Sequence, residues 1–377
     1  MEILSAIASI NALIIAFLVS RKKEKSTSDY ILIAWIINFS FHFAIPFCIE
    51  NKVFIHDSYW GFLMGLFVVA HAPFIFVYTS SLTNPNFKVS FKYFYHFALI
   101  LVFIATFIPY FSLAPEDRLK VVQQKESLTY HSLLPMLALL LTRVYFLTRT
   151  IIIIVKHQYE IKQSFSYEHK VNLEWIKLIA YLFFGIIVLS FVLYGLVSVH
   201  IISVFQMDYL LITANMLVFF YIAYSGYKQG SIQDISPTLV SEVIETKTEK
   251  KPLPVTSSDK PLYEGNYHPA IQELLKQMEK DKLYLEPELN IGNVANQLNI
   301  HAHQLSKLIN TQLGKNFFEF VNAYRVEEFK KIAADPKNRH ISILGLAMDA
   351  GFNSKATFNR IFKNSTGLTP SEFMKSF

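Results

Sequence analysis

Long apolar runs limit what this chain can fold into more than any other feature of its sequence. Seven of them occupy residues 3–20, 30–49, 59–82, 91–110, 133–154, 175–199 and 208–227. A helix needs about 20 mostly apolar residues to cross the ~30 Å hydrocarbon core of a bilayer. The composition agrees, because 52% of all residues are hydrophobic and only 17% are charged. Residues 1–230 are therefore predicted to form a bundle of seven transmembrane helices.

The distribution of basic residues between the runs predicts the orientation of this bundle. Cytoplasmic loops carry an excess of Lys and Arg. The loops after runs one, three and five hold Arg21, Lys22, Lys23, Lys25, Lys88, Lys92, Lys156, Lys162 and Lys170. Those after runs two, four and six hold only Lys52, Arg118, Lys120 and Lys125. The pattern predicts an N-terminus outside and a C-terminus inside, with the first run kept as an anchor.

A few polar residues inside the runs are candidates for intramembrane sensing. Arg143 lies in the middle of the fifth run, and no Asp or Glu lies in the interior of any run. A charge at that depth is costly and often functional, so Arg143 binds either an anionic ligand or structural partners such as carbonyls or Asn215. Asn38 and His42 share a helix face, and His71 precedes a proline. These three either line a pocket or form hydrogen bonds between helices.

Nothing in the sequence indicates catalysis or a bound metal. Cys48 is the one cysteine, which excludes an intrachain disulfide and a cysteine-cluster metal site. No third His or carboxylate lies at metal-ligand spacing, and no phosphate-binding loop, HExxH or GxSxG motif occurs. We therefore expect no catalytic residues, no cofactor and no enzyme activity.

The sequence after residue 230 changes character twice. Residues 231–267 have no apolar periodicity and contain four prolines, which is typical of a flexible linker. Residues 268–280 then place Ile271, Leu274, Leu275 and Met278 on one face of a predicted amphipathic helix. That helix packs either on the domain that follows it or on a second copy of the chain.

The last part of the chain, at about residues 291–311 and 342–364, contains two copies of one pattern. Each copy has a short predicted helix with a small residue on its inner face, a turn, and a second helix with apolar residues at helical spacing. Two helices that cross closely through a short turn form a helix-turn-helix, whose second helix enters the DNA major groove. Residues 317–333 are predicted to form a helix that joins the copies. Ser342 and Asn353 are predicted N-caps.

The two copies, the joining helix and the tail FNRIFKNSTGLTPSEF resemble the AraC/XylS-type DNA-binding domain, over residues 268–377. Gly292 and Met374 depart from the family's pattern without breaking it. Arg325 is expected to be buried and to tie the two halves together. The resemblance assigns structural roles to Ala295, Gly314, Arg325, Ala347, Gly351, Phe352, Gly367 and Pro370.

The resemblance also identifies the outward faces of the second helices as DNA-reading surfaces. Their Arg, Lys and Asn side chains have donors and acceptors that suit major-groove base edges. The alternative is that several of them are ordinary solvated surface. The predicted base-reading residues are His303, Ser306, Lys307, Asn310, Lys355, Ala356, Asn359 and Arg360. Lys315 and Lys363 are predicted to contact the DNA backbone.

Together these features predict an all-α, membrane-bound, sequence-specific transcription factor of the bacterial cytoplasmic (inner) membrane, with its DNA-binding domain in the cytoplasm. Expected partners are double-stranded promoter DNA, the lipid bilayer and an unidentified small-molecule or lipid signal, with RNA polymerase and a second copy of the chain as further candidates. Two alternatives remain open. One is a transporter- or receptor-like protein whose C-terminal domain docks other proteins. The other is a precursor whose DNA-binding domain is released by proteolysis in the linker.

Overall fold

The computed structural model describes residues 2–51, 60–84, 87–88, 98–114, 117, 130–168, 172–229 and 267–375. The chain divides into two compact units, and each is described by itself below. Unit 1 comprises Met1–Val155 and Leu173–Ser231, and unit 2 comprises Lys156–Asn172 and Ile232–Phe377. Most of the predicted linker, residues 231–266, lies outside the described residues. The described residues form helices and one isolated antiparallel bridge between Phe165 and Asn290.

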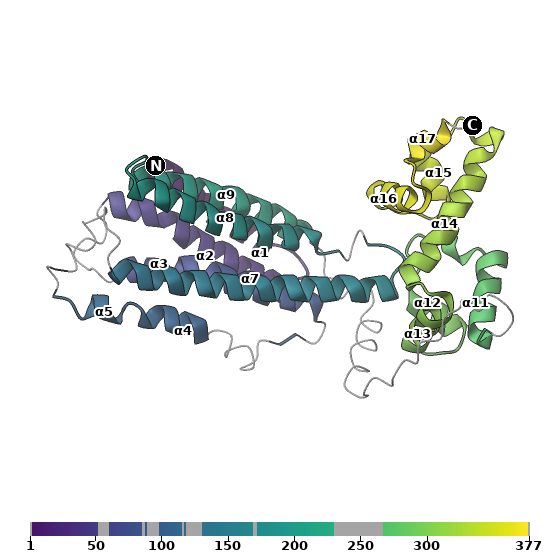
Figure 1. The fold of residues 1–377 in the computed structure, drawn as a ribbon, viewed down its shortest axis with the longest axis horizontal. Coiled ribbons are helices and arrows are strands. Elements are labelled where there is room, and N and C mark those ends of the chain that lie inside the picture. Colours follow the sequence, from purple (N-terminus) through teal and green to yellow (C-terminus); the bar gives the residue numbers. More distant parts are fainter. Residues whose placement is uncertain are drawn as a thin grey trace. The chain divides into compact units, whose positions relative to one another are not determined.

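Six helices of the described residues are long and apolar enough to cross a membrane, all of them beginning in unit 1 (Figure 1). They are α1 (Glu2–Ser20), α2 (Thr27–Glu50), α3 (Trp60–Thr83), α7 (Tyr130–Ser164), α8 (Glu174–Ser198) and α9 (Val204–Lys228). They correspond to six of the seven predicted runs. Helix α7 continues beyond the predicted end at residue 154, because the polar stretch that follows contains no glycine or proline to stop it.

The fourth predicted run is only partly described. Its described residues form α4 (Ala98–Ala105) and α5 (Ile108–Phe111), with Thr106 and Phe107 between them. Pro109 lies in the first turn of α5, where its missing N–H costs nothing but where it cannot continue a preceding helix. Residues 91–97 lie outside the described residues. A seventh transmembrane helix therefore stays a prediction.

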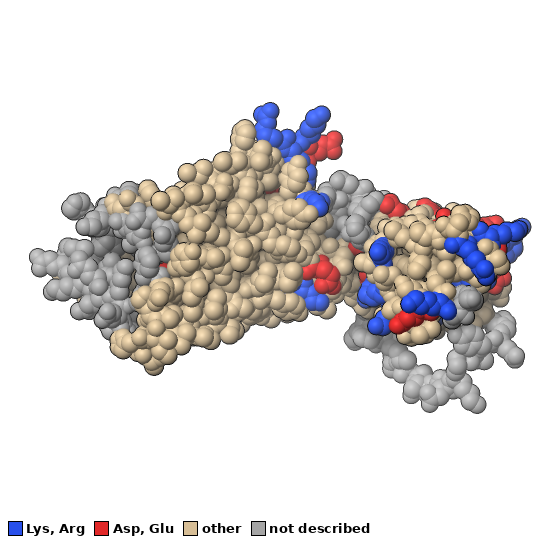
Figure 2. All heavy atoms as spheres, turned by 90° about the horizontal axis from the view of Figure 1, so that it is seen from above, with Lys and Arg blue, Asp and Glu red and all other residues tan. Residues whose placement is uncertain are grey.

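Aromatic side chains fill the interior of unit 1. On α2, Trp35, Phe39 and Phe43 are fully buried, and the rings of Phe39 and Phe43 lie 5.2 and 5.5 Å from that of Phe219 on α9. Helix α2 packs against α1, α3 and α9. Many Leu, Ile, Val and Phe side chains are exposed on the outside, and Figure 2 shows a face with hardly any charge except at one end. An exposed apolar surface of this extent suits contact with lipid.

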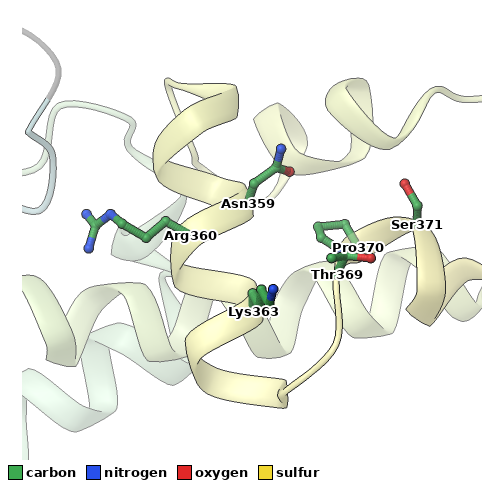
Figure 3. A pocket seen from close by; sticks show the side chains of 6 residues that line it. All are labelled: Asn359, Arg360, Lys363, Thr369, Pro370 and Ser371. Carbon is green, nitrogen blue, oxygen red and sulfur yellow. The ribbon is translucent and has the colours of Figure 1, made fainter.

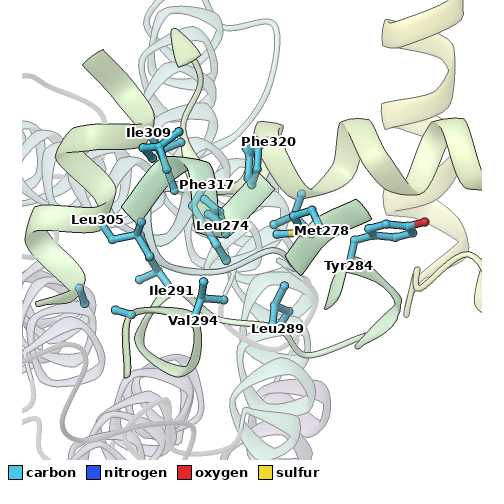
Figure 4. Packing of buried hydrophobic residues seen from close by; sticks show 14 residues of the cluster. Leu274, Met278, Tyr284, Leu289, Ile291, Val294, Leu305, Ile309, Phe317 and Phe320 are labelled. Atoms are coloured by element: carbon cyan, nitrogen blue, oxygen red, sulfur yellow. The ribbon is translucent and has the colours of Figure 1, made fainter. Parts of the chain in front are cut away.

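Unit 2 is built on two hydrophobic cores that share one helix. The first core joins α11 (Pro269–Lys280), the short turn η4 (Leu283–Leu285), α12 (Ile291–Gln297) and α13 (Ala302–Leu313), as Figure 4 shows. The second joins α15 (Ile343–Asp349) and α16 (Lys355–Thr366), with part of α17 (Pro370–Met374) packed against it. Helix α14 (Phe317–Ala334) contributes Phe317 and Phe320 to the first core and Val326 and Phe329 to the second. It therefore fixes the two halves to one another.

Local capping explains where these helices begin and end. Asn290 caps α12, Asn316 and Glu319 form a capping box on α14, and Ser342 caps α15 as predicted. The prediction of Asn353 as an N-cap was wrong by one residue. Helix α16 starts at Lys355, so its cap is Ser354, whose hydroxyl accepts from the third amide of the helix. The predicted amphipathic helix is α11, and its apolar face packs within unit 2.

Candidate nucleic-acid interface

Helix α13 turns a polar face outward because its apolar residues recur at helical spacing. Leu305 and Ile309 are fully buried in the first core, and Leu308 packs against it. The predicted base-reading residues of this helix therefore lie on its other side. His303, Lys307 and Asn310 are exposed and Ser306 is half-buried. Lys315 is also exposed, just after the left-handed Gly314 that ends the helix.

Helix α16 repeats the arrangement in the second half. Phe358 and Phe362 are buried against Phe329 of α14, with ring centroids 4.7 and 5.2 Å away. The outward residues Lys355, Ala356, Asn359, Arg360 and Lys363 are all exposed. The structure thus places each predicted base-reading residue on the outer face of its helix.

A hollow of about 460 Å³ lies beside α16. It is lined by Asn359, Arg360, Lys363, Thr369, Pro370 and Ser371. In Figure 3, Asn359 extends towards the start of α17, whereas Arg360 points to the opposite side of α16. Thr369 and Glu372 form a capping box that fixes this turn. The hollow carries the Lys363 ammonium and the Asn359 amide, a combination that suits a polyanion such as DNA.

Arg325 is the most constrained cation of unit 2. Its side chain is 1% exposed, and its Nε donates to the Tyr284 carbonyl at 2.7 Å and its Nη2 to the Glu286 carbonyl at 2.6 Å. Its Nη1 and Nη2 also donate to the carbonyl and hydroxyl of Ser166, each at 3.0 Å. Arg325 thus joins α14 to the η4 turn and to the segment Lys156–Asn172. The burial agrees with expectation, but nothing in the sequence indicated Ser166 as a partner.

Gly351 lies at a close approach between the two halves of the domain. Its φ is +91°, in the region that favours glycine. A Cβ built on it would lie 2.4 Å from the Tyr284 carbonyl oxygen and 2.9 Å from the Cα of Leu285. The structural role expected of Gly351 is therefore a left-handed turn, together with a tight contact that the sequence did not indicate. The other small or apolar residues with predicted structural roles are placed as follows: Ala295, Ala347, Phe352 and Pro370 are buried, and Gly314 and Gly367 have positive φ.

Glu328 is a functional candidate that sequence reasoning missed. Its carboxylate accepts from the Lys282 ammonium at 2.7 Å and from the Tyr284 hydroxyl at 3.0 Å. Burial raises the pKa of Glu328, but these two hydrogen bonds outweigh it, so the pKa lies below its usual range. Burial and the bond to Glu328 raise the pKa of Tyr284 to about 12. The hydrogen bonds of Glu328 with Lys282 and Tyr284 are therefore a second connection between α14 and the η4 turn.

Three of the four predicted sensing residues of unit 1 come together around His71. The Nδ1 of His71 accepts from the Trp35 indole at 3.2 Å and lies 3.3 Å from the Asn38 amide nitrogen. Its Nε2 lies 2.9 Å from Nδ1 of His42. Since Nδ1 accepts, the proton of a neutral His71 is on Nε2 and is donated to His42. Arg143, the fourth of these residues, lies on α7 and is half-buried.

Comparison with known proteins agrees with the geometry of unit 2. Residues 294–376 match the family model described as "Helix-turn-helix domain". Over 107 residues the chain is 29% identical to the probable transcription factor PqrA of Proteus vulgaris, covering 28% of this chain and 84% of PqrA. Over 92 residues it is 29% identical to an uncharacterized HTH-type transcriptional regulator of Staphylococcus aureus (strain COL), covering 24% of this chain and 12% of that protein.

A solved structure of a Listeria innocua protein of unknown function is 28% identical, covering 29% of this chain and 98% of that one, with a TM-score of 0.26. Two outward polar helices on a shared scaffold, with these regulator relatives, define the class of protein: a DNA-binding transcriptional regulator. More particularly, its C-terminal domain is an AraC-type helix-turn-helix domain, and six apolar helices precede it in the chain, consistent with membrane tethering.

Proposed function

We propose that this protein is a membrane-bound, sequence-specific transcription factor of the bacterial cytoplasmic membrane that responds to a signal sensed by its helical bundle. The observation that carries the proposal is the pair of exposed polar faces on α13 and α16, held by the shared helix α14. The basic loops after the first, third and fifth runs support a cytoplasmic C-terminal domain. Residues 231–267 serve as the linker. RNA polymerase and a second copy of the chain are further proposed partners.

In this proposal α13 and α16 enter successive major-groove faces of one duplex, about 34 Å apart. Arg360 has the planar fork that pairs with guanine, and Asn310 and Asn359 have the amide that pairs with adenine. Lys315 and Lys363 neutralise phosphates and supply salt-dependent affinity. One chain then reads two short blocks of sequence without requiring a palindrome.

Replacing Arg360 by alanine tests base reading. We expect a loss of about 1–3 kcal/mol at one base position, with relaxed specificity there. Lys363→Ala is the matched control on the same helix, and it should weaken binding to all sequences alike while lowering the salt slope by about one. Both are measured by titrating full-length protein in nanodiscs with a set of duplexes that differ at single positions. Uniform weakening by Arg360→Ala on every duplex would refute its role as a base reader.

The polar cluster of unit 1 is the proposed sensing site. Arg143 is a half-buried cation in the apolar part of α7, and no Asp or Glu lies in the interior of any of the seven apolar runs. A charge at this depth needs a partner, and an anionic or strongly polar ligand would provide one. A shift of α2, α3 and α7 around such a ligand is the proposed signal.

Arg143→Gln should fix transcription from the target promoters at one level across growth conditions, while protein abundance stays near wild type. Arg143→Lys should fail as well, since lysine cannot form a bidentate clamp on an anion. Arg149→Gln, at an exposed position on the same helix, is the control. The measurement pairs a promoter reporter with immunoblots of membrane fractions. An abundant and fully responsive Arg143→Gln variant would remove Arg143 from sensing.

A further inference from the structure

The segment that connects α7 to α8 belongs to the same compact unit as the helix-turn-helix domain. Unit 2 contains Lys156–Asn172 as well as Ile232–Phe377. Within this stretch, residues 163–168 contact the domain at three places, and we call them the docked segment. The docked segment begins with the last two residues of α7, and the chain continues from Asn172 towards α8. It is thus covalently linked to two candidate membrane helices.

Ser166 anchors the docked segment. Its amide and its hydroxyl both donate to the Leu289 carbonyl, at 3.1 and 2.7 Å. Its own carbonyl accepts from Arg325 and from the Asn322 amide, each at 3.0 Å. Phe165, which pairs with Asn290 in the isolated bridge, is buried, as are Ser166 and Tyr167. The middle of the docked segment is therefore held by a specific and largely buried set of contacts with the helix-turn-helix domain.

The two ends of the docked segment bind residues that are proposed to read DNA. At one end, the Gln163 amide oxygen accepts from the Asn310 amide at 2.6 Å and from the Ser306 hydroxyl at 3.2 Å. At the other end, the Glu168 carboxylate accepts from the Arg360 guanidinium. One short stretch therefore contacts the reading faces of both α13 and α16.

These contacts compete with DNA for the same atoms. A carboxylate on Arg360 occupies the donors that would face a guanine or a phosphate, and it brings a negative charge to a surface that must accept a polyanion. The ion pair is half-exposed on the side of Arg360, at 46%, and mostly covered on the side of Glu168, at 16%. Water reaches the guanidinium, so opening the pair costs less than breaking a fully buried one.

We propose that the docked segment is an internal competitor that holds the helix-turn-helix domain in a state unable to read DNA, and that movement of α7 and α8 withdraws it. The proposal rests on the proposed function as a DNA-binding regulator and specifies its regulation. The buried hydrogen bonds of Ser166 fix where the segment docks on the domain. The polar ends at Gln163 and Glu168 block the reading residues directly.

The first test weakens the two polar ends. The duplex for this test comes from the promoter that the protein occupies most in a genome-wide mapping of bound DNA. Gln163→Ala combined with Glu168→Gln should tighten the binding of full-length protein in nanodiscs to this duplex by about tenfold. Glu24→Gln, which removes the same charge from another loop predicted to be cytoplasmic, should leave the affinity unchanged. An equal gain in both variants would show a general charge effect and would overturn the proposal, as would no gain in the double variant.

The second test locks the segment in place. Phe165 and Asn290 lie opposite each other in an antiparallel bridge. The backbone hydrogen bond next to them joins their neighbours Ser166 and Leu289, so Phe165 and Asn290 form the non-hydrogen-bonded type of pair. The Cα atoms of such a pair lie about 4.5 Å apart. That separation suits a disulfide. In a Cys48→Ser background, Phe165→Cys with Asn290→Cys should form one on oxidation, and neither position is a proposed base reader. A pair that does not cross-link would itself contradict the docking.

DNA binding is then compared between the oxidised and reduced forms of this same variant. We expect the oxidised form to bind the promoter duplex at least about tenfold more weakly than the reduced form. Equal binding by both forms would overturn the internal competitor while leaving DNA binding by the protein intact. The proposed function would be overturned instead if neither the oxidised form, the reduced form nor the wild-type chain bound any duplex taken from the mapped promoters.

Discussion

Gly351→Ala is expected to lower the free energy of unfolding of the helix-turn-helix domain by about 2–5 kcal/mol. A left-handed backbone costs a non-glycine residue about 1–2 kcal/mol, and forcing extra atoms into a packed site costs a further ~1–3 kcal/mol. The new methyl group would lie 2.4 Å from the Tyr284 carbonyl oxygen, and the backbone atoms around it cannot swing aside like a side chain. Hydrogen exchange of peptides from 268–377, in full-length protein, measures the loss.

Gly367→Ala is the matched control for this experiment. Gly367 has a φ of +76°, but a Cβ there would meet nothing within 4 Å. Only the conformational cost of about 1–2 kcal/mol should remain. Equal losses in the two variants would show that the close approach at Tyr284 is unimportant and that backbone conformation explains both.

Arg325→Met should be comparably damaging, by on the order of 3–5 kcal/mol. The methionine fills a similar volume but leaves the Tyr284 carbonyl without the Arg325 donor, and it removes one of two donors from the carbonyls of Glu286 and Ser166. Each buried polar group left unsatisfied costs about 1–3 kcal/mol. Arg325→Lys should recover only part of the loss, because one ammonium cannot span acceptors on both the η4 turn and Ser166. The same hydrogen-exchange measurement applies.

Arg339→Ala provides the comparison, since Arg339 is an exposed arginine in the same domain. It should change the stability by less than about 0.5 kcal/mol. If Arg325→Met were as well tolerated as Arg339→Ala, the carbonyl set around the guanidinium would not be what joins the two halves of the domain.

The features that could be predicted from sequence are those with a local period. Leu305 and Ile309, or Phe358 and Phe362, define a buried face, so the outward residues of α13 and α16 follow from helical geometry alone. Apolar runs predict membrane helices in the same way. The apolar stretch of α7 ends near residue 154, and the polar residues after it carry no such pattern. The extension of the helix to Ser164 was therefore not predicted.

Contacts between distant parts of the chain had no such signal. Ser166 meets Leu289 across 123 positions, and Glu168 meets Arg360 across 192. Neither pair belongs to a repeat, and Gln163, Ser166 and Glu168 look like ordinary loop residues. The pairing of His42 with His71 similarly depends on how α2 packs on α3, although each residue was singled out for its depth in an apolar run.

Because α7 and the docked segment are parts of one chain, the block on DNA binding does not depend on how many copies of the protein a cell holds. A competitor on the same chain as its target acts at an effective concentration set by the connecting chain, not by the number of molecules present. Making more copies of the protein supplies more readers and, in equal number, more competitors. The fraction of domains free to bind a promoter should then depend on the state of the membrane helices alone. Higher expression then raises the number of free domains in proportion, without changing the fraction that is free at a given signal level.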